Sequence, residues 1–352
     1  MTGTTETIEV SDQNQLVANP LVSVLMITYN HADYLAEAIE GVVSQRCEFP
    51  FELIIGEDAS KDDTLKVALD YQRRYPEIIR VLHSATNVGM IANVNRVYAR
   101  ARGEFTSVCE GDDFWCARDK LARQAEILKK DTLVGIVHAD WTRMTCKNGT
   151  WQFDLRKSVH RRVPARLLEG DLFSTWHFPK VLRTCTVMLR RQIALEMLDS
   201  ELWRKPYRFG DSVQNAFVTS NWLVAYLPEV VAVYRVSPNS ALRSGAAARV
   251  EFYKSCLEFD ADAQAFFASR RAYAKNYRWE SDMALLLWSL RAIDEKSIRF
   301  ALRDMWEHFD PIEFVATGCK ALWMRVPTLR RQPRELPQGV PAVRPVPTTD
   351  AK

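Results

Sequence analysis

The run Leu21-Val22-Ser23-Val24-Leu25-Met26-Ile27-Thr28 decides the fold class of this chain. It is short, apolar and rich in β-branched residues, and it lies between Pro20 and the polar pair Tyr29-Asn30. A strand that is buried on both faces has this composition, and such strands are typical of parallel sheets. We therefore predict that residues 21–28 form the first strand of a parallel sheet.

The order of strand, polar loop and amphipathic helix repeats along the first 140 residues. Apolar residues at helical spacing predict helices over 32–45, 62–75, 89–102 and 118–130. Short apolar runs predict strands over 51–56, 78–82, 105–109 and 134–138. This alternation is typical of βαβ units in an α/β domain. The loops that follow the strands, at 29–30, 57–58, 83–87 and 110–113, should therefore meet at the carboxyl edge of one sheet.

The second half of the chain departs from this rhythm. Residues 141–182 are basic and aromatic with little periodicity, which predicts a loop-rich insertion. Further strands are predicted over 184–189, 222–227 and 230–236, and helices over 192–198 and 211–219. The pattern over 246–323 is helical, and these helices either cap the α/β domain or form a small separate bundle. We expect a flexible segment at 1–19, an α/β domain at 20–245, a helical region at 246–324 and a disordered Pro/Arg-rich tail at 325–352.

Composition excludes several classes of protein. With 47% hydrophobic and 26% charged residues among 352, the chain is neither disordered nor fibrous. Seven cysteines without a CxxC pair indicate a reducing cytoplasm. The polar start of the chain predicts no secretory leader, and no apolar run reaches the roughly 18 residues of a membrane span. We expect no nucleic-acid partner.

The C-terminal tail is basic, with seven Lys/Arg against two Asp/Glu from Lys320 onward. It follows apolar residues between Ile312 and Met324. Two interpretations are open: peripheral contact with the inner face of an anionic membrane, or a packed C-terminal helix with a solvated tail.

The loop Cys109-Glu110-Gly111-Asp112-Asp113-Phe114-Trp115 carries the chemistry that the sequence indicates most directly. Its carboxylates suit a hard divalent cation, although glycine and aspartate also form polar turns that have no further role. The sequence lacks GxGxxG, GxxxxGK[ST] and GxSxG, so no glycine-rich loop cradles a phosphate. A divalent metal held by Asp112, with Glu110 or Asp113 helping directly or through water, would replace such a cradle.

An acidic pair, Glu57-Asp58, follows the second predicted strand. An acid at this place receives ribose hydroxyls or a base N–H in many nucleotide sites. Ser60, Asp62 and Asp63 then cap the next helix, which is compatible with ligand binding by the preceding pair.

Four segments, 22–31, 54–64, 87–93 and 110–115, resemble family 2 glycosyltransferases in order and spacing, and a weaker similarity extends to about residue 240. The resemblance implies the GT-A fold, a nucleotide-diphosphate sugar as donor, a divalent metal, usually Mn²⁺ or Mg²⁺, and inversion of the anomeric centre. It also implies the following site residues: for the nucleotide sugar Thr28, Asn30, Glu57, Asp58, Asn87 and Asp112, for the metal Asp112, Asp113 and Glu110, and for the general base Asp211.

Some of these assignments have a structural alternative. Asp211 begins a predicted helix, where aspartate is also a common N-cap. Trp115 would either stack on the acceptor sugar or pack against the following helix.

The chain also departs from the family pattern. It has Glu110 where aspartate is common, Lys61 and Asp63 where Thr and Gly are usual, and Ser237-Pro238 where a histidine is frequent. Arg235 or Arg243 could replace that histidine as a phosphate contact.

The function expected from these features is transfer of a sugar to a hydroxyl of a glycan or lipid-linked acceptor in bacterial surface polysaccharide assembly. A non-catalytic binding module on the same fold is the alternative, but such a module would be expected to lose the acidic pair or the base. A sugar nucleotidyltransferase would need a glycine-rich basic loop after the first strand, where this chain has Tyr29-Asn30-His31-Ala32.

Overall fold

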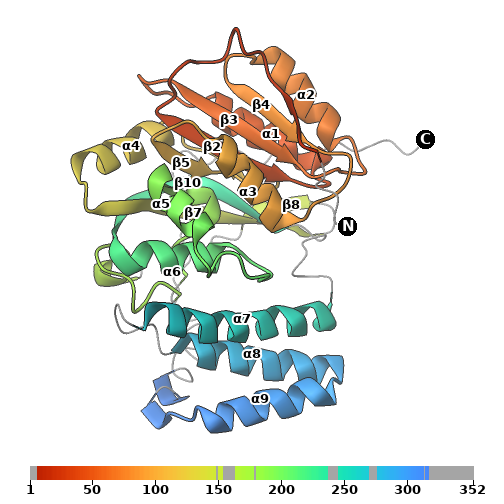
Figure 1. Cartoon of the computed structure of the whole chain (residues 1–352), viewed down its shortest axis with the longest axis vertical. Coiled ribbons are helices and arrows are strands. Elements are labelled where there is room, and N and C mark those ends of the chain that lie inside the picture. The colour runs from red at the N-terminus through yellow and green to blue at the C-terminus, as the bar shows by residue number, and fades with distance from the viewer. Residues whose placement is uncertain are drawn as a thin grey trace.

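The structure is a computed structural model that describes residues 6–147, 150–153, 163–177, 180–236, 245–268, 276–312 and 314–316. Within these ranges the strands form one mixed sheet in the order β1-β4-β3-β2-β5-β9-β7-β10-β6, with β8 beside β7 (Figure 1). The strands are β1 Ile8–Val10, β2 Val22–Thr28, β3 Phe51–Glu57, β4 Ile79–His83, β5 Phe105–Val108, β6 Phe114–Trp115, β7 Val134–Lys147, β8 Thr150–Phe153, β9 Met188–Arg190 and β10 Leu223–Val236. The helices are α1 Ala32–Val43, α2 Thr64–Arg74, α3 Met90–Arg100, α4 Lys120–Lys130, α5 Arg191–Asp199, α6 Asp211–Asn221, α7 Ala246–Phe267, α8 Asn276–Ala292 and α9 Glu295–Glu307.

The predicted βαβ order of the first half is confirmed. β2 pairs in parallel with β3 and β5, and β3 pairs in parallel with β4. The antiparallel strands β1, β6, β8 and β9 lie around this parallel core. The domain is therefore α/β with a mostly parallel sheet, and the loops after β2, β3, β4 and β5 lie at one edge.

Alternation along each strand supplies both faces of the sheet. Leu25 of β2 and Ile54 of β3 belong to one core cluster, which includes residues of α3, α5, α6 and α7. Their neighbours Val24 and Ile55 belong to the second cluster, which includes residues of α1, α2 and α4. The unbroken apolar run at residues 21–28 thus reflects burial on both faces.

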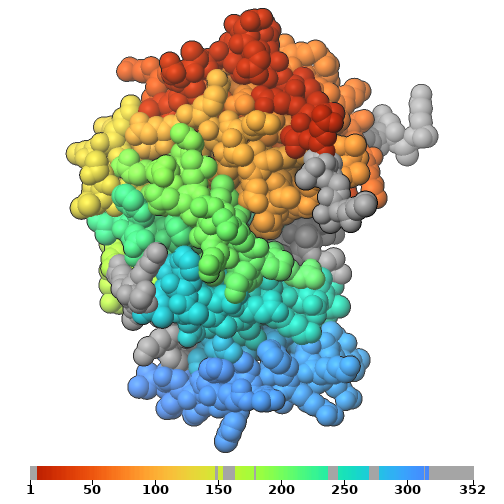
Figure 2. All heavy atoms as spheres, viewed as in Figure 1, coloured from red at the N-terminus to blue at the C-terminus, as the bar shows by residue number. Residues whose placement is uncertain are grey.

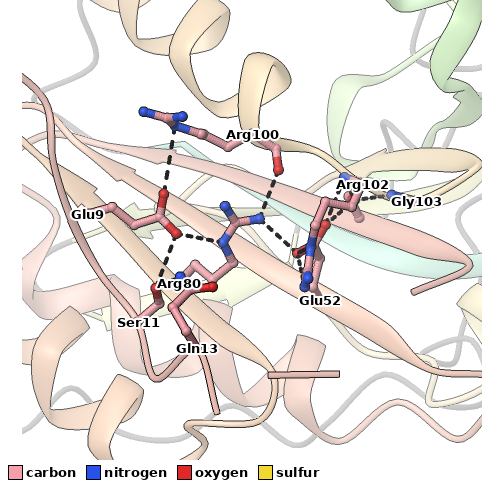
Figure 3. Close-up of polar contacts among 9 residues, drawn as sticks. Glu9, Ser11, Gln13, Glu52, Arg80, Arg100, Arg102 and Gly103 are labelled. Carbon is pink, nitrogen blue, oxygen red and sulfur yellow. Dashed lines mark hydrogen bonds and ion pairs between the residues drawn. The ribbon is translucent and has the colours of Figure 1, made fainter. Parts of the chain in front are cut away.

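The amino edge of the sheet carries a closed network of charges, shown in Figure 3. Glu52 is fully buried and accepts hydrogen bonds from the Ser23 hydroxyl at 2.6 Å and from Nε of Arg102 at 2.9 Å. Arg80 donates to Glu52 at 3.0 Å and, through Nε, to Glu9 of β1 at 2.9 Å. We call Glu9, Ser23, Glu52, Arg80 and Arg102 the amino-edge network.

This network corrects the expectation that the N-terminal segment is flexible throughout. β1 pairs antiparallel with β4, and Glu9 links it to Arg80, a residue 71 positions further along the chain. A partner so distant leaves no local pattern in a strand of three residues.

Three other strands differ from the sequence-based prediction. β7 continues from Val134 to Lys147 and forms a hairpin with β8, so part of the expected loop-rich insertion is strand. The two strands expected after residue 222 are one strand, β10, with register shifts between Leu227 and Ala232. Residues 184–186 form a 3₁₀ turn before β9.

The C-terminal helices both cap the domain and stack on one another. In Figure 1, α7, α8 and α9 lie one beneath the other, and Figure 2 shows them at the end of the molecule opposite the N-terminal strands. Phe259 of α7 is fully buried and packs on Tyr207 and Phe209, with ring centroids 5.3 Å and 5.6 Å apart. α7 therefore belongs to the core of the α/β domain.

No helix in the described ranges combines the length and the apolar character that a membrane crossing requires. Ser237-Pro238, Arg243 and the tail at 325–352 lie outside the described residues, so the predictions that concern them remain predictions.

Candidate active site

The loops after β2 and β3 are tied together at the carboxyl edge. Asn30 adopts a positive φ of 54°, a conformation that asparagine tolerates better than most residues. Its backbone N–H donates to the Ser60 hydroxyl at 2.9 Å, and its side-chain oxygen accepts from the Lys61 N–H at 2.8 Å. The exposed Asn30 thus stands on a fixed loop, as a ligand contact requires.

A second connection joins the loops after β3 and β4. The buried Asp58 carboxylate accepts the backbone N–H groups of Val88 at 2.7 Å and Gly89 at 3.0 Å. The Asn87 side chain donates to the Asp58 carbonyl oxygen at 2.9 Å. Asp58 and Asn87 therefore lie together, as expected, and the contacts they make brace the two loops.

Glu57 is fully buried at the end of β3. One of its carboxylate oxygens accepts the Ser60 N–H at 2.6 Å and the other accepts the Ala59 N–H at 3.2 Å. In this structure Glu57 orders the loop that would face a nucleotide.

The acidic loop, residues 110–113, lies against the end of β2. The Gly111 N–H donates to the Ile27 carbonyl oxygen at 3.0 Å. A Cβ atom at Gly111 would approach Thr28 Oγ1 to 2.7 Å and Thr28 Cβ to 2.8 Å, so only glycine fits here. The Thr28 hydroxyl itself is buried without a hydrogen-bond partner in the described structure. The expected nucleotide residue and the acidic loop are thus in close contact.

Asp113 does not join the other acids of the loop. Its carboxyl is 1% exposed, and Oδ1 accepts the Arg235 backbone N–H at 2.9 Å. Burial, together with the nearby Asp112 and Glu110, raises the pKa of Asp113 well above its ordinary value. In this structure Asp113 faces the interior and holds the backbone of Arg235, and its role as a metal ligand remains a prediction.

Glu110, Asp112 and Asp211 form the acidic centre of the site. Burial, together with the charges of Asp112 and Asp211, raises the pKa of Glu110 to about 8, while Arg183 opposes the shift. In the described residues, no hydrogen bond or ion pair holds the side chains of Glu110 and Asp112. The sequence-predicted base and the acidic loop, about a hundred residues apart, are therefore electrostatically close.

This centre fits a divalent cation in charge and in ligand chemistry. Asp112 and Asp211 are close enough to Glu110 to raise its pKa, and a hard cation would stabilise such a group of carboxylates. The described residues contain no group of three side chains that could hold such an ion. Glu110 and Asp112 would therefore share the ion with ligand oxygens or water.

Trp115 is not placed to receive an acceptor sugar. It is 3% exposed, its indole N–H donates to the Cys185 carbonyl oxygen at 2.8 Å, and the Lys120 ammonium lies 4.0 Å from a ring centroid. The interpretation that Trp115 packs against the following helix is correct, because β6 turns the ring inward.

Asp211 lies exposed at the first position of α6. Its carboxylate accepts the N–H of Ser212 at 2.8 Å, and Gly210 precedes it as the N-cap residue. Edge-to-face packing of Phe209 against Phe252 and Phe259 of α7 fixes the segment that leads to it. The N-cap interpretation is therefore wrong, and an open carboxylate faces solvent at the site.

The residue-by-residue prediction missed two cationic or titratable groups. His31 Nδ1 is buried without a partner, and burial lowers the pKa of His31 although Asp112 opposes the shift. Arg183 lies near Glu110, between the unpatterned region at 141–182 and the strand predicted over 184–189. A sequence signal existed for His31, which directly follows Tyr29-Asn30, whereas Arg183 had none.

Arg235 is close to the acidic loop but fully engaged. It is 4% exposed, donates to the Asp112 carbonyl oxygen at 3.0 Å, pairs with Glu37, and lies 4.5 Å from the Phe114 ring centroid. Its role is to hold the loop, so the phosphate contact expected of it is not supported.

Comparison with known proteins places this geometry in a family. The model of glycosyl transferase family 2 matches residues 23–195. Over these residues the chain belongs to glycosyl transferase family 2. The matched part contains the acidic loop and all the predicted nucleotide residues, whereas Asp211 follows it.

Curated relatives of this family 2 chain include an uncharacterised protein of Mycobacterium tuberculosis, 31% identical over 234 residues. The match covers 66% of this chain and 64% of that protein, so the two share less than two thirds of the relative's length. The putative glycosyltransferase EpsE of Bacillus subtilis is 36% identical over 113 residues, 32% of this chain and 40% of EpsE. The putative teichuronic acid biosynthesis glycosyltransferase TuaG of the same species is 33% identical over 109 residues, 31% of this chain and 42% of TuaG.

Solved structures share the fold of the family 2 chain at low identity. Residues 1–349 of Staphylococcus aureus TarS in complex with UDP-GlcNAc give a TM-score of 0.56 at 17% identity, covering 83% of this chain and 82% of that one. The mannosyltransferase PcManGT of Pyrobaculum calidifontis, in complex with GDP-Man and Mn²⁺, gives 0.51 at 19% identity, covering 89% and 83%. These similarities establish the GT-A fold.

Proposed function

We propose that this protein is an inverting glycosyltransferase that moves a sugar from a nucleotide-diphosphate donor to a hydroxyl of a glycan or lipid-linked acceptor. The observation that carries the proposal is the meeting of Glu110, Asp112 and Asp211 at the carboxyl edge, beside the unpartnered Thr28 hydroxyl. Open carboxylates on a family 2 scaffold favour transfer over passive binding, because binding alone needs no base.

Each side chain has a defined task in this proposal. Thr28 and Asn30 border the nucleotide, on loops that Glu57, Asp58 and Asn87 hold in place. Glu110 and Asp112 would hold Mn²⁺ or Mg²⁺, which supplies positive charge to the donor diphosphate. Asp211 accepts the proton of the acceptor hydroxyl as its oxygen attacks the anomeric carbon.

The relatives support a setting for this reaction. One carries the name of a teichuronic acid biosynthesis glycosyltransferase, and the TarS and PcManGT structures contain UDP-GlcNAc and GDP-Man. We propose that the present chain acts in bacterial surface polysaccharide assembly at the cytoplasmic face of the membrane, with the basic tail as a peripheral contact.

The proposal is tested by separating donor binding from transfer. The intact chain is screened by thermal shift with UDP-GlcNAc and GDP-mannose in Mn²⁺, where a donor that binds only the folded protein raises the melting temperature. Asp112→Asn should abolish this shift. Asp211→Asn should retain it but lower nucleotide release in the presence of acceptor about 10²–10⁴-fold.

Two results would contradict the proposal. One is the absence of a melting shift with any nucleotide sugar across a broad donor panel. The other is unchanged nucleotide release by Asp211→Asn, since a base that touches the acceptor proton cannot be dispensable.

A further inference from the structure

Arg183 is a cation at the site without an assigned task. Its guanidinium carbon lies 4.8 Å from the ring centroid of Trp141 and 5.8 Å from that of Tyr234. Nε of Arg183 is buried without a hydrogen-bond partner, and no ion pair in the described part of the chain involves this side chain. Two rings therefore fix the group while its N–H donors stay available.

Trp141 adds a second unsatisfied donor to this cluster. The side chain is 4% exposed, and its indole N–H has no partner among the described residues. The Trp141 and Tyr234 rings meet edge to face with centroids 5.9 Å apart, on the neighbouring strands β7 and β10. Buried donors are normally paired, so two of them on adjoining side chains indicate a missing acceptor.

Arg235 provides an internal comparison. Both arginines lie near the acidic loop and over aromatic rings. Arg235, however, donates hydrogen bonds to Glu37 and to the Asp112 carbonyl oxygen. Arg183 has no such acceptor among the residues that the structure describes. The guanidinium of Arg235 thus stabilises the folded loop, whereas that of Arg183 is available to bind a ligand.

The missing acceptor should be an oxyanion. A planar guanidinium donates in a fork that matches phosphate oxygens, and a neighbouring indole N–H adds a donor. Arg183 also acts electrostatically on Glu110, so the cluster lies beside the carboxylates that would hold the metal. A phosphate group between a bound divalent ion and Arg183 would meet positive charge on two sides.

We propose that Arg183, held by Trp141 and Tyr234, binds the diphosphate of the donor and stabilises it as the leaving group. This inference rests on the proposed function. In the transfer, the bond between the anomeric carbon and the diphosphate oxygen breaks and its electron pair stays on that oxygen, opposite Arg183. The acceptor oxygen forms the new bond to the anomeric carbon, and its proton passes to Asp211.

The test compares Arg183→Gln and Arg183→Lys with Arg299→Gln as control. Arg299 is a surface residue of α9 whose side chain is 83% exposed, so its substitution removes the same charge away from the site. Binding of UDP, GDP, UMP and GMP to each intact variant is measured by calorimetry with Mn²⁺, and transfer is measured with the donor that the wild type accepts.

Arg183→Gln should weaken binding of the nucleoside diphosphate about tenfold or more while changing monophosphate binding little. It should also lower kcat about 10²-fold, because charge on the leaving group is greatest in the transition state. Arg183→Lys should recover part of both losses, and Arg299→Gln should match the wild type.

Three results would overturn the inference. Equal diphosphate affinity in folded Arg183→Gln and wild type is the first. A raised acceptor KM with unchanged diphosphate affinity is the second, and it would place an acceptor anion at Arg183. If the wild type binds no nucleotide diphosphate, the proposed function fails together with the inference, whereas the first two results leave that function standing.

Discussion

The two edges of the sheet bury charge in opposite ways. At the amino edge, Glu52 accepts from Ser23, Arg80 and Arg102, and these hydrogen bonds bring the pKa of Glu52 below its ordinary value although burial alone would raise it. At the carboxyl edge, burial and the charges of Asp112 and Asp211 raise the pKa of Glu110 to about 8 although Arg183 opposes the shift, and no hydrogen bond among the described residues stabilises the Glu110 carboxylate.

The difference separates charges that serve the fold from charges that serve a ligand. A buried ion that is fully hydrogen-bonded needs nothing from outside the chain, whereas an unpaired one is stabilised only when something binds. The Thr28 hydroxyl, His31 Nδ1 and Arg183 Nε, all unpartnered, gather at the same edge as Glu110. At this edge, unsatisfied groups and the raised pKa of Glu110 occur together, which the amino-edge network does not show.

The largest expected effect comes from breaking the amino-edge network. Glu52→Ala leaves Arg80 and Arg102 without their buried acceptor and should lower the free energy of unfolding by about 3–5 kcal/mol. Nucleotide release per folded molecule should not change. Urea denaturation measures the first quantity and an activity assay the second. Glu77→Ala, at an exposed position, serves as control, and a loss below about 1 kcal/mol for Glu52→Ala would contradict the role of the network.

Lys120 offers an intermediate case, a buried charge with neutral partners. Its ammonium donates to Ser107 at 2.7 Å and to Gln124 at 2.8 Å, and burial lowers the pKa of Lys120 to about 7 from 10.5, opposed by the thiols of Cys109 and Cys185. Between these pKa values the unfolded chain binds a proton that the folded chain does not. The Lys120 contribution to stability should therefore rise with pH across that window, by up to about 1.4 kcal/mol per pH unit.

Lys120→Met isolates this contribution. The difference in unfolding free energy between wild type and Lys120→Met should change steadily from about pH 7 to about pH 10 in favour of the wild type. Other groups titrate alike in both proteins and cancel. Parallel stability curves would show that Lys120 keeps an ordinary pKa.

At the carboxyl edge, removal of a buried carboxylate should have the opposite effect on the free energy of unfolding. Glu110→Gln removes a carboxyl whose charged form is disfavoured by burial and by the neighbouring acids, so we expect the free energy of unfolding to stay equal or rise by about 0.5–2 kcal/mol. Metal-stimulated nucleotide release should fall strongly. Denaturation and activity measured on one preparation give both values. A destabilised Glu110→Gln would mean that the buried carboxylates at both edges of the sheet stabilise the fold.

The smallest effect concerns Trp115. Trp115→Phe keeps the buried ring but leaves the Cys185 carbonyl oxygen without its donor, which should cost about 1 kcal/mol. The acceptor KM should stay unchanged because the ring is covered. A KM raised tenfold for acceptor alone would restore Trp115 as an acceptor contact.

The sequence predicted the parallel core well because each strand from β2 to β5 is an unbroken apolar run with a polar loop behind it. From that order alone, Thr28, Asn30, Glu57, Asp58, Asn87 and Asp112 could be assigned to one edge, and the structure brings them there. The pattern of apolar and polar residues is a local property of the sequence. These strands could be predicted because their local composition determines them.

Features that depend on distant contacts were missed. The inward direction of Asp113 follows from Arg235, whose backbone N–H it accepts across 122 residues. The site position of Arg183 follows from rings on β7, whose length the sequence underestimated, and on β10, which the sequence divided into two strands. Neither the direction of a side chain nor the absence of its partner can be read from a pattern of residue types.

The burial of Phe259 between Tyr207 and Phe209 has a consequence for where this domain ends. A chain cut at residue 245 would keep every residue of the family match yet strip one wall from the aromatic cluster beneath the segment that carries Asp211. We expect such a fragment to expose those rings to water, to aggregate, and to lose the base geometry before any loss at the nucleotide loops. The segment that matches the family, residues 23–195, is therefore shorter than the segment that must fold together, which includes α7.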